Sequence, residues 1–378
     1  MRGCVGVGIV GCSVVLACSS NDAVAPTQSP GNGGTVAAAG APVAGMGNGG
    51  TAGIINSPSG GNAGTSTSPG GSGGVTGGSG GASGGVAGTN GGAAGVAGAA
   101  AGSDGGTAGD APPALAALVP SGTCPEFQQG LLTFSPSTGP REVEVLMTTQ
   151  AMTQDGPIVF GWHATGGDPN QAIGWFGAEQ IAELNAIGGI LIAPYREPNA
   201  STRPWYYTPE GPGDADNDML LMDEIVACAI EKVGIDQRRI HAYGMSAGGL
   251  MTVQVGYRRS SYVASVVVYS GGQVGDVPNQ DPTNKFAAMV VHGGATDVSS
   301  VDGITYQPAS ETYVTNLKAA GHFAFLCNHD SGHTDPAVLA NADQAHTSAW
   351  QFLQDHPYGV ASPYAAALPQ GFWSDCAL

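Results

Sequence analysis

The stretch Ile240-His241-Ala242-Tyr243-Gly244-Met245-Ser246-Ala247-Gly248-Gly249-Leu250 decides the fold of this chain. Its apolar beginning is typical of a buried strand, and Ser246 follows in the pattern G-x-S-x-G. A nucleophilic serine stands on a sharp turn between a strand and a helix, where only small side chains fit two residues before and after it. Such a turn also aims the N–H of Ala247 and the positive end of the helix at a developing oxyanion. The stretch therefore predicts a strand, a tight turn carrying Ser246, and a helix.

Chance is the alternative explanation of this pattern, because the chain holds 63 glycines. Most of them lie elsewhere, in a low-complexity region from about residue 27 to 113. That region has too little bulky apolar surface to offset its ordering entropy, and it lacks the period of three that indicates collagen. We predict a flexible Gly/Ala/Ser-rich tether over 19–120 and one globular domain over 121–378, which is long enough for a sizeable core.

Short apolar runs alternate with segments of helical spacing throughout the predicted domain. Besides the stretch quoted above, the expected strands are 141–149, 157–163, 189–194, 263–269, 287–292 and 322–327, and the expected helices are 171–187, 218–233, 309–320 and 341–355. Buried strands of four to eight residues that alternate with helices form mostly parallel sheets covered on both faces. The predicted fold class is therefore α/β.

The N-terminus has the features of an export signal. Arg2 precedes an apolar run over 3–17, which is too short to span a membrane and fits a secretory signal. The run ends in Val15-Leu16-Ala17-Cys18, which resembles the lipobox of bacterial lipoproteins; Cys12 ends a second possible match, and an ordinary cleaved signal is the alternative. We expect a signal over 1–18, lipidation at Cys18, and membrane contact only through this anchor, at the bacterial outer membrane or cell surface.

The four cysteines of the predicted domain suggest two disulfides in an oxidising compartment, with three possible pairings. We expect Cys124 to pair with Cys376, because the two bracket the domain. The sequence has no C-x-x-C pair and no His/Cys cluster, so we expect no metal and no cofactor. The net charge of −18, with only 11 Lys and Arg, argues against a nucleic-acid partner.

A nucleophilic serine needs a base, and the base needs a carboxylate to hold its tautomer. In sheets of this class the acid and the histidine follow the serine in chain order, each on a loop after a later strand. His333 lies just past the last expected strand, and His329 is the alternative in the same loop. Asp297 follows the strand over 287–292, and Asp302 is the alternative acid.

An oxyanion hole needs a second N–H donor beside that of Ala247. The loop after the strand over 157–163 contains Ala164 and Thr165, either of which can supply it. Aromatic side chains near these loops are candidates for lining a substrate pocket. The predicted substrate contacts are Trp162, Trp205 and Tyr206.

From about Cys124 to Leu353 the sequence resembles the esterase branch of the α/β-hydrolases related to poly(3-hydroxybutyrate) depolymerases and feruloyl esterases. The resemblance rests on the segments 160–163, 218, 235–240, 244–249, 292–297 and 332–334. It implies a mostly parallel central sheet with helices on both faces, and a Ser-His-Asp triad that cleaves a small-molecule or polymer-linked ester through an acyl-enzyme. Two alternatives stay open: a serine peptidase, which can share G-x-S-x-G-G, and a non-catalytic surface binding protein on the same fold.

Overall fold

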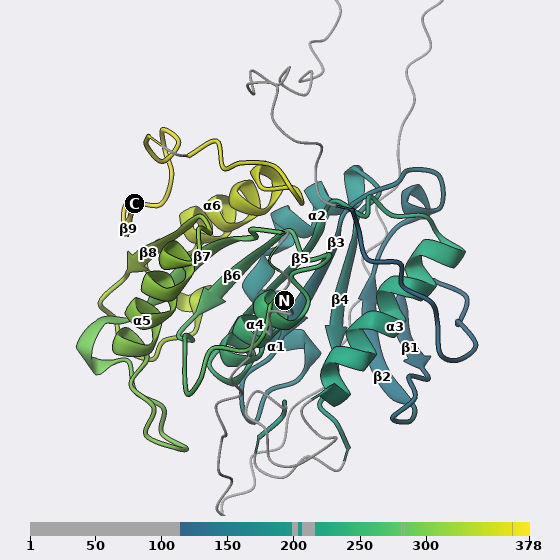
Figure 1. Ribbon diagram of the computed structural model, residues 1–378, viewed down its shortest axis with the longest axis horizontal. Helices are drawn as coiled ribbons and strands as arrows, with labels where there is room; N and C mark the ends of the chain where they lie inside the picture. The colour runs from purple at the N-terminus through teal and green to yellow at the C-terminus, as the bar shows by residue number, and fades with distance from the viewer. Residues whose placement is uncertain (1–113, 199–202, 206–215, 281, 283, 365) are drawn as a thin grey trace, which may run out of the picture. The chain divides into compact units, whose positions relative to one another are not determined.

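The computed structural model describes residues 114–198, 203–205, 216–280, 282, 284–364 and 366–378, which all belong to one compact unit. Its centre is a sheet of nine strands in the described part of the chain, in the order β1-β2-β4-β3-β5-β6-β7-β8-β9 (Figure 1). The strands are β1 (Gly130–Phe134), β2 (Arg141–Leu146), β3 (Ile158–Trp162), β4 (Ile190–Pro194), β5 (Ile240–Met245), β6 (Ser265–Tyr269), β7 (Ala287–His292), β8 (Ala324–Asn328) and β9 (Cys376–Ala377).

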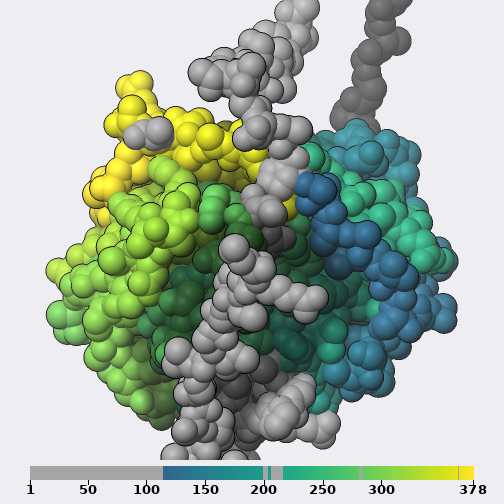
Figure 2. All heavy atoms as spheres, in the orientation of Figure 1, coloured from purple at the N-terminus to yellow at the C-terminus, as the bar shows by residue number. Residues whose placement is uncertain are grey.

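Strands β4, β3, β5, β6, β7 and β8 are parallel, while β1, β2 and β9 pair antiparallel at the two sides. In Figure 2 the blue surface belongs to the part of the chain that contains β1 and β2, and the yellow-green surface on the opposite side belongs to the part that contains α5 and β8. Because the carboxyl ends of parallel strands meet at one edge, the loops after β3, β5, β7 and β8 share that edge. The expected mostly parallel α/β sheet is therefore confirmed.

Helices cover both faces of the sheet (Figure 1). The α-helices are α1 (Pro169–Phe176), α2 (Ala178–Ala186), α3 (Asn217–Lys232), α4 (Ala247–Arg258), α5 (Tyr306–Ala319) and α6 (Ala342–Asp355), and short 3-10 turns are η1 (Thr149–Met152), η3 (Gly294–Thr296) and η4 (Pro336–Val338). One apolar core lies under α3, α4 and α5, and a second lies under α1, α2 and α6. Every residue of β3 to β7 is buried, as expected for strands covered on both faces. None of the helices in the described ranges is long and apolar enough to cross a membrane.

Two helices differ from the sequence expectation. The single helix expected over 171–187 is broken at Gly177, whose φ of 92° and ψ of 140° are not helical. A positive φ of this size favours glycine, and the chain changes direction there between α1 and α2. The helix expected from residue 309 begins instead at Tyr306. Pro308 does not end it, because the first turn of a helix needs no backbone N–H there.

The expected disulfide between Cys124 and Cys376 is wrong. Cys124 pairs with Cys228, and Cys327 pairs with Cys376. Cys124 precedes β1 at one side of the sheet, whereas Cys376 lies in β9 at the other side, so the two ends are too far apart to be bridged.

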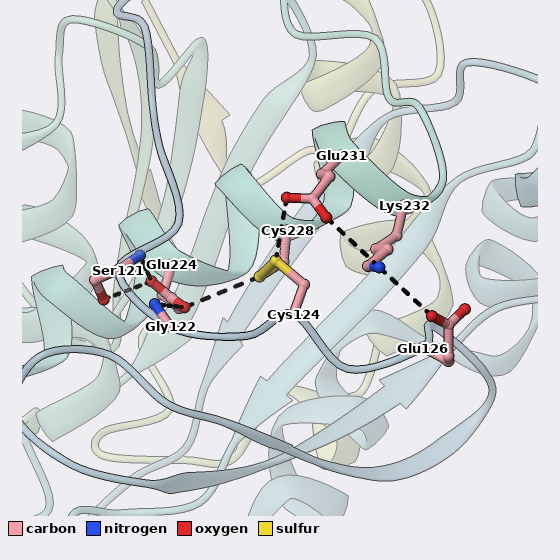
Figure 3. Close-up of a disulfide and its surroundings, with 8 residues drawn as sticks. All are labelled: Ser121, Gly122, Cys124, Glu126, Glu224, Cys228, Glu231 and Lys232. Carbon is pink, nitrogen blue, oxygen red and sulfur yellow. Dashed lines mark hydrogen bonds and ion pairs between the residues drawn. A yellow bond between two sulfur atoms is a disulfide. The ribbon is translucent and has the colours of Figure 1, made fainter.

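The Cys124–Cys228 disulfide fastens the segment before β1 to helix α3 (Figure 3). The buried carboxylate of Glu224, one turn before Cys228, accepts hydrogen bonds from the backbone N–H of Ser121 at 2.6 Å and of Gly122 at 3.0 Å. The Ser121 hydroxyl donates to the same carboxylate at 2.7 Å. The attachment therefore combines a covalent bond with charge-assisted hydrogen bonds.

Candidate active site

Ser246 lies on the turn between β5 and α4, in backbone geometry that residues with a side chain rarely adopt. Its φ of 57° and ψ of −121° are those of a strained turn, and its side chain is buried. A side chain at Gly244 or Gly248 would strike the backbone carbonyl of Trp162 in β3. The small residues of G-x-S-x-G are therefore required by the close approach of β3 to the turn.

His333 and Asp297 extend a chain of hydrogen bonds from Ser246. The distance from Ser246 Oγ to His333 Nε2 is 3.1 Å, and the distance from His333 Nδ1 to Asp297 Oδ1 is 2.8 Å. The second carboxylate oxygen of Asp297 accepts from the Ser270 hydroxyl at 2.9 Å and from the Gly293 N–H at 2.8 Å. The Asp297 side chain has no exposed surface, so these donors replace water around its charge.

The loops after β7 and β8 are held together by their backbones. The N–H of Gly332 donates to the carbonyl of Gly293 at 2.8 Å, and a side chain at Gly293 would strike the backbone of Gly332. Gly332 itself has a φ of 68°, which favours glycine. This backbone contact fixes Asp297, on the first loop, against His333, on the second.

The two alternatives from the sequence have other contacts. His329 accepts a hydrogen bond from the Ser331 N–H at 3.2 Å, and its ring stacks on Trp373. Asp302 is exposed and accepts only from the N–H of Ile304 among the described residues. His333, in contrast, contacts Ser246 directly, and Asp297 is connected to Ser246 through the His333 ring.

Two backbone N–H groups beside Ser246 have no acceptor among the described residues: those of Ala247 and Thr165. Ala164, the alternative to Thr165, donates its N–H to Gln171 Oε1 at 3.1 Å. Since that donor is occupied, Thr165 is the freer of the two oxyanion candidates. Ala164 and Thr165 both line the cavity that contains Ser246.

The predicted aromatic substrate contacts lie behind the site rather than in it. Trp162 is fully buried in β3, and Trp205 is 2% exposed. The Trp205 indole N–H donates to the carbonyl of His163 at 2.7 Å, and its ring packs edge-on against Trp162. Trp205 therefore supports the loop that carries Thr165, and neither tryptophan reaches the cavity. Tyr206 lies outside the described residues.

A cavity of about 260 Å³ opens beside Ser246. Its wall mixes polar side chains, among them Gln171, Ser299, Ser300 and Asp335, with the apolar Met245 and Val301. In the part of the chain that the structure describes, no Phe, Tyr or Trp and no Lys or Arg lines this cavity.

Tyr306, which the sequence reasoning did not select, contacts this site closely. Its hydroxyl lies 3.2 Å from Ser246 Oγ, and its ring stacks on that of His333, with centroids 4.9 Å apart and planes 8° from parallel. Burial raises the pKa of the Tyr306 hydroxyl, so the hydroxyl keeps its proton near neutral pH. The one feature of the sequence that could have pointed to Tyr306 is Pro308. A proline there indicates a helix start directly after the loop that carries Asp297.

A metal site is not apparent in the described ranges, where no group of three or more His, Cys, Asp or Glu side chains could hold an ion. The acidic residues at the start of α3 contact arginines instead. Asp218 forms a buried ion pair with Arg141 at 3.0 Å, and Asp216 pairs with Arg258 at 2.9 Å.

No family model matches the chain. A curated protein named "Putative esterase NocK", from Nocardia uniformis subsp. tsuyamanensis, is 23% identical over 160 residues, which are 42% of this chain and 45% of that protein. This chain therefore spans less than half the length of that relative.

Among solved structures, the native crystal structure of sOPH superposes with a TM-score of 0.54 at 20% identity, over 68% of this chain and 96% of that one. That of native pOPH gives 0.53 at 21% identity, over 68% and 96%. These likenesses and the strand order show that the fold is that of an α/β-hydrolase, which confirms the fold expected from the sequence.

Proposed function

We propose that this protein is a serine esterase, in which Ser246 is the nucleophile, His333 the general base and Asp297 the carboxylate that orients the base. The observation that carries the proposal is the hydrogen-bond chain from Ser246 through His333 to Asp297, at 3.1 and 2.8 Å, on a strained turn. A hydroxyl is a weak nucleophile unless a positioned base takes its proton, and this geometry supplies one.

The first half of the reaction forms an acyl-enzyme. His333 Nε2 accepts the Ser246 proton as Oγ attacks the ester carbonyl carbon, and the carbonyl oxygen becomes an oxyanion. The N–H groups of Ala247 and Thr165 donate to that oxyanion, and each such donor contributes about 10²- to 10³-fold in turnover. The imidazolium, held by Asp297, then gives its proton to the alcohol as the C–O bond breaks.

The second half returns the serine. Water takes the place of the alcohol, loses a proton to His333 Nε2, and attacks the acyl carbonyl carbon. The tetrahedral intermediate collapses with departure of Ser246 Oγ, which recovers its proton from His333. The products are a carboxylic acid and an alcohol, and the cycle uses no cofactor.

Within ester hydrolysis, the cavity favours a short acyl group, as in an acetyl esterase, over a feruloyl group. Its volume of about 260 Å³ is below the range of about 300 to 1,000 Å³ that drug-sized ligands occupy. Its described wall also offers no indole or phenyl ring on which a feruloyl ring would stack. Cleavage of a polymer-linked ester, as in a polyhydroxyalkanoate depolymerase, is the alternative within this proposal.

The decisive experiment is hydrolysis of p-nitrophenyl esters of increasing acyl length by the full chain. We expect a burst of one nitrophenol per active site and the highest kcat/KM on the shortest esters. Ser246→Ala should abolish the burst, whereas Ser261→Ala, just beyond the other end of α4, should keep it. Retention of full activity by Ser246→Ala would refute the proposed mechanism.

The same proteins separate the alternative functions. A fluorophosphonate that labels wild type but not Ser246→Ala, combined with cleavage of peptides and not of esters, would support a serine peptidase instead. Failure of the folded wild type to be labelled would support a non-catalytic binding protein.

We also propose that the chain is exported and anchored through lipid on Cys18, which lies outside the described residues. The two disulfides support an oxidising compartment. Cys18→Ala should release the protein from the membrane fraction and remove lipid mass from its N-terminal peptide. An unchanged distribution would refute the anchor.

A further inference from the structure

We propose that Tyr306 is a fourth catalytic residue, which donates a hydrogen bond to Ser246 Oγ and supports the charged form of the His333 ring. This inference rests on the proposed function, because it concerns the same nucleophile and base. It adds a residue that belongs neither to the triad nor to the oxyanion hole. Its basis is that Tyr306 contacts all three residues of the hydrogen-bond chain.

These three contacts come from different parts of Tyr306. The hydroxyl is 3.2 Å from Ser246 Oγ, the ring stacks on His333, and the backbone N–H donates to the carbonyl of Asp297 at 2.9 Å. An isolated bridge between Val298 and Thr305 closes the intervening loop. The loop that begins at Asp297 therefore folds back and places Tyr306 next to Asp297.

The direction of the hydroxyl contact follows from counting protons. Asp297 accepts from His333 Nδ1, which leaves a lone pair on Nε2 to accept the single proton of Ser246. Ser246 then has no proton left for Tyr306, so within this pair the Tyr306 O–H is the donor to Ser246 Oγ; the Ser299 side chain is a second hydrogen-bond partner of the Tyr306 hydroxyl. Tyr306 is 1% exposed, and burial raises its pKa, so it remains a donor through the working pH range.

Both side-chain contacts gain strength when charge develops. As the proton leaves Ser246, Oγ becomes partly negative, and a hydrogen bond to a charged oxygen is roughly twice as strong as a neutral one. At the same time His333 becomes an imidazolium beside the electron-rich face of the Tyr306 ring. Oγ is also the leaving atom in deacylation, so the same donor assists both halves of the reaction.

The competing explanation is that Tyr306 only fills the core. Tyr313, on the same helix α5, provides the matched control, because its hydroxyl is buried and has no hydrogen-bond partner in the described structure. Its ring packs on Tyr257, away from the three site residues. Removal of either hydroxyl costs similar packing, but only that of Tyr306 faces the nucleophile.

The test compares Tyr306→Phe, Tyr306→Leu and Tyr313→Phe in the full chain. The readouts are the rate of covalent labelling by a fluorophosphonate, which needs no knowledge of the natural ester, and the pH dependence of p-nitrophenyl acetate hydrolysis. Tyr306→Phe should slow labelling and the acylation burst about 10-fold with little change in the pH profile. Tyr306→Leu should lower the kinetic pKa of the acidic limb by about 0.5 unit, because the imidazolium loses the ring face.

A core-filling role would change melting temperature in all three variants and leave the labelling rate and kinetic pKa alone. Labelling of Tyr306→Phe at the wild-type rate, with Ser246→Ala unlabelled, would overturn the role of Tyr306 while leaving the nucleophile in place. Absence of labelling in folded wild type would instead overturn the proposed function. Should Tyr306→Leu fail to fold, Tyr306→Phe and Tyr313→Phe still decide the hydroxyl contact.

Discussion

Replacement of Asp297 by asparagine tests the hydrogen-bond chain most sharply, because it changes one atom of a fully buried group. The carboxylate accepts three hydrogen bonds: from His333 on one oxygen, and from Ser270 and Gly293 on the other. An amide offers one oxygen and one NH₂, so it cannot accept on both sides.

The backbone N–H of Gly293 decides which way the amide turns. It cannot rotate, so an NH₂ placed against it at 2.8 Å would pair two donors and leave both buried without an acceptor, at a cost of about 1–3 kcal/mol. The amide oxygen therefore faces Gly293 and the NH₂ faces His333 Nδ1. His333 must then accept at Nδ1 and carry its proton on Nε2, where it cannot take the proton of Ser246.

We expect Asp297→Asn to lower kcat on p-nitrophenyl acetate by about 10⁴-fold, as for the equivalent change in a serine-protease triad. At 1.36 kcal/mol per factor of ten this is about 5.5 kcal/mol of lost transition-state stabilisation. The fluorescence melting curve should move little, because the shape of the residue is kept. Nitrogen-15 NMR of His333 should show the proton moved from Nδ1 to Nε2.

Asp302→Asn is the matched control, since Asp302 is an exposed carboxylate five residues along the same loop. It should retain wild-type activity. The reasoning would be refuted if Asp297→Asn kept more than a tenth of the wild-type kcat, or if its His333 kept the proton on Nδ1.

Three further outcomes are expected. Asp335→Asn, which removes the one carboxylate of the described cavity wall, should shift the kcat/KM ratio of anionic to cationic esters upward by roughly 3- to 10-fold; an unchanged ratio would exclude this charge from specificity. Burial lowers the pKa of His241 to about 3, so its unfolded form takes up a proton below about pH 6.5 while the folded form does not. Stability in urea should therefore fall as pH drops from 6.5 toward 3, by up to about 1.4 kcal/mol per pH unit from this group, and His241→Asn should flatten the slope. The disulfide from Cys124 to Cys228 closes a sequence separation of 104 residues, so replacing both cysteines by alanine should cost up to about 5 kcal/mol of unfolding free energy, and a change below 1 kcal/mol would show that the segment before β1 does not need it.

At the turn that carries Ser246, rules that involve only neighbouring residues were sufficient to predict the local structure. Gly244 and Gly248 are spaced by the sterics of a single turn, and the alternation of short apolar runs with helices follows from covering a parallel sheet on both faces. The order of serine, acid and histidine along the chain then restricted the choice to a few loop residues. The structure places Ser246, Asp297 and His333 within hydrogen-bonding distance, while their catalytic roles stay a proposal.

The wrong disulfide prediction concerns a contact between segments that are far apart in the sequence. The pairing of Cys124 depends on which side of the sheet each cysteine reaches, and spacing along the chain carries no information on that. The break of the helix at Gly177 rests on a backbone φ of 92°, which glycine adopts readily and which helical spacing of the apolar residues does not reveal. Trp205 was predicted to contact substrate because it is aromatic and lies near the site in the sequence. In the structure its indole N–H donates to the carbonyl of His163.

The sequence by itself determined the α/β fold, the turn that carries Ser246, and a short set of candidates for its base and acid, because these follow from patterns within a few residues. The tertiary structure alone decided that Tyr306 lies against Ser246 and His333. It also decided that the N–H of Ala164 donates to Gln171, whereas the N–H of Thr165 has no acceptor among the described residues. Those facts depend on how loops from different strands meet at one edge of the sheet. No local sequence pattern predicts how these loops lie relative to one another, because the position of each loop is set by residues that pack behind it.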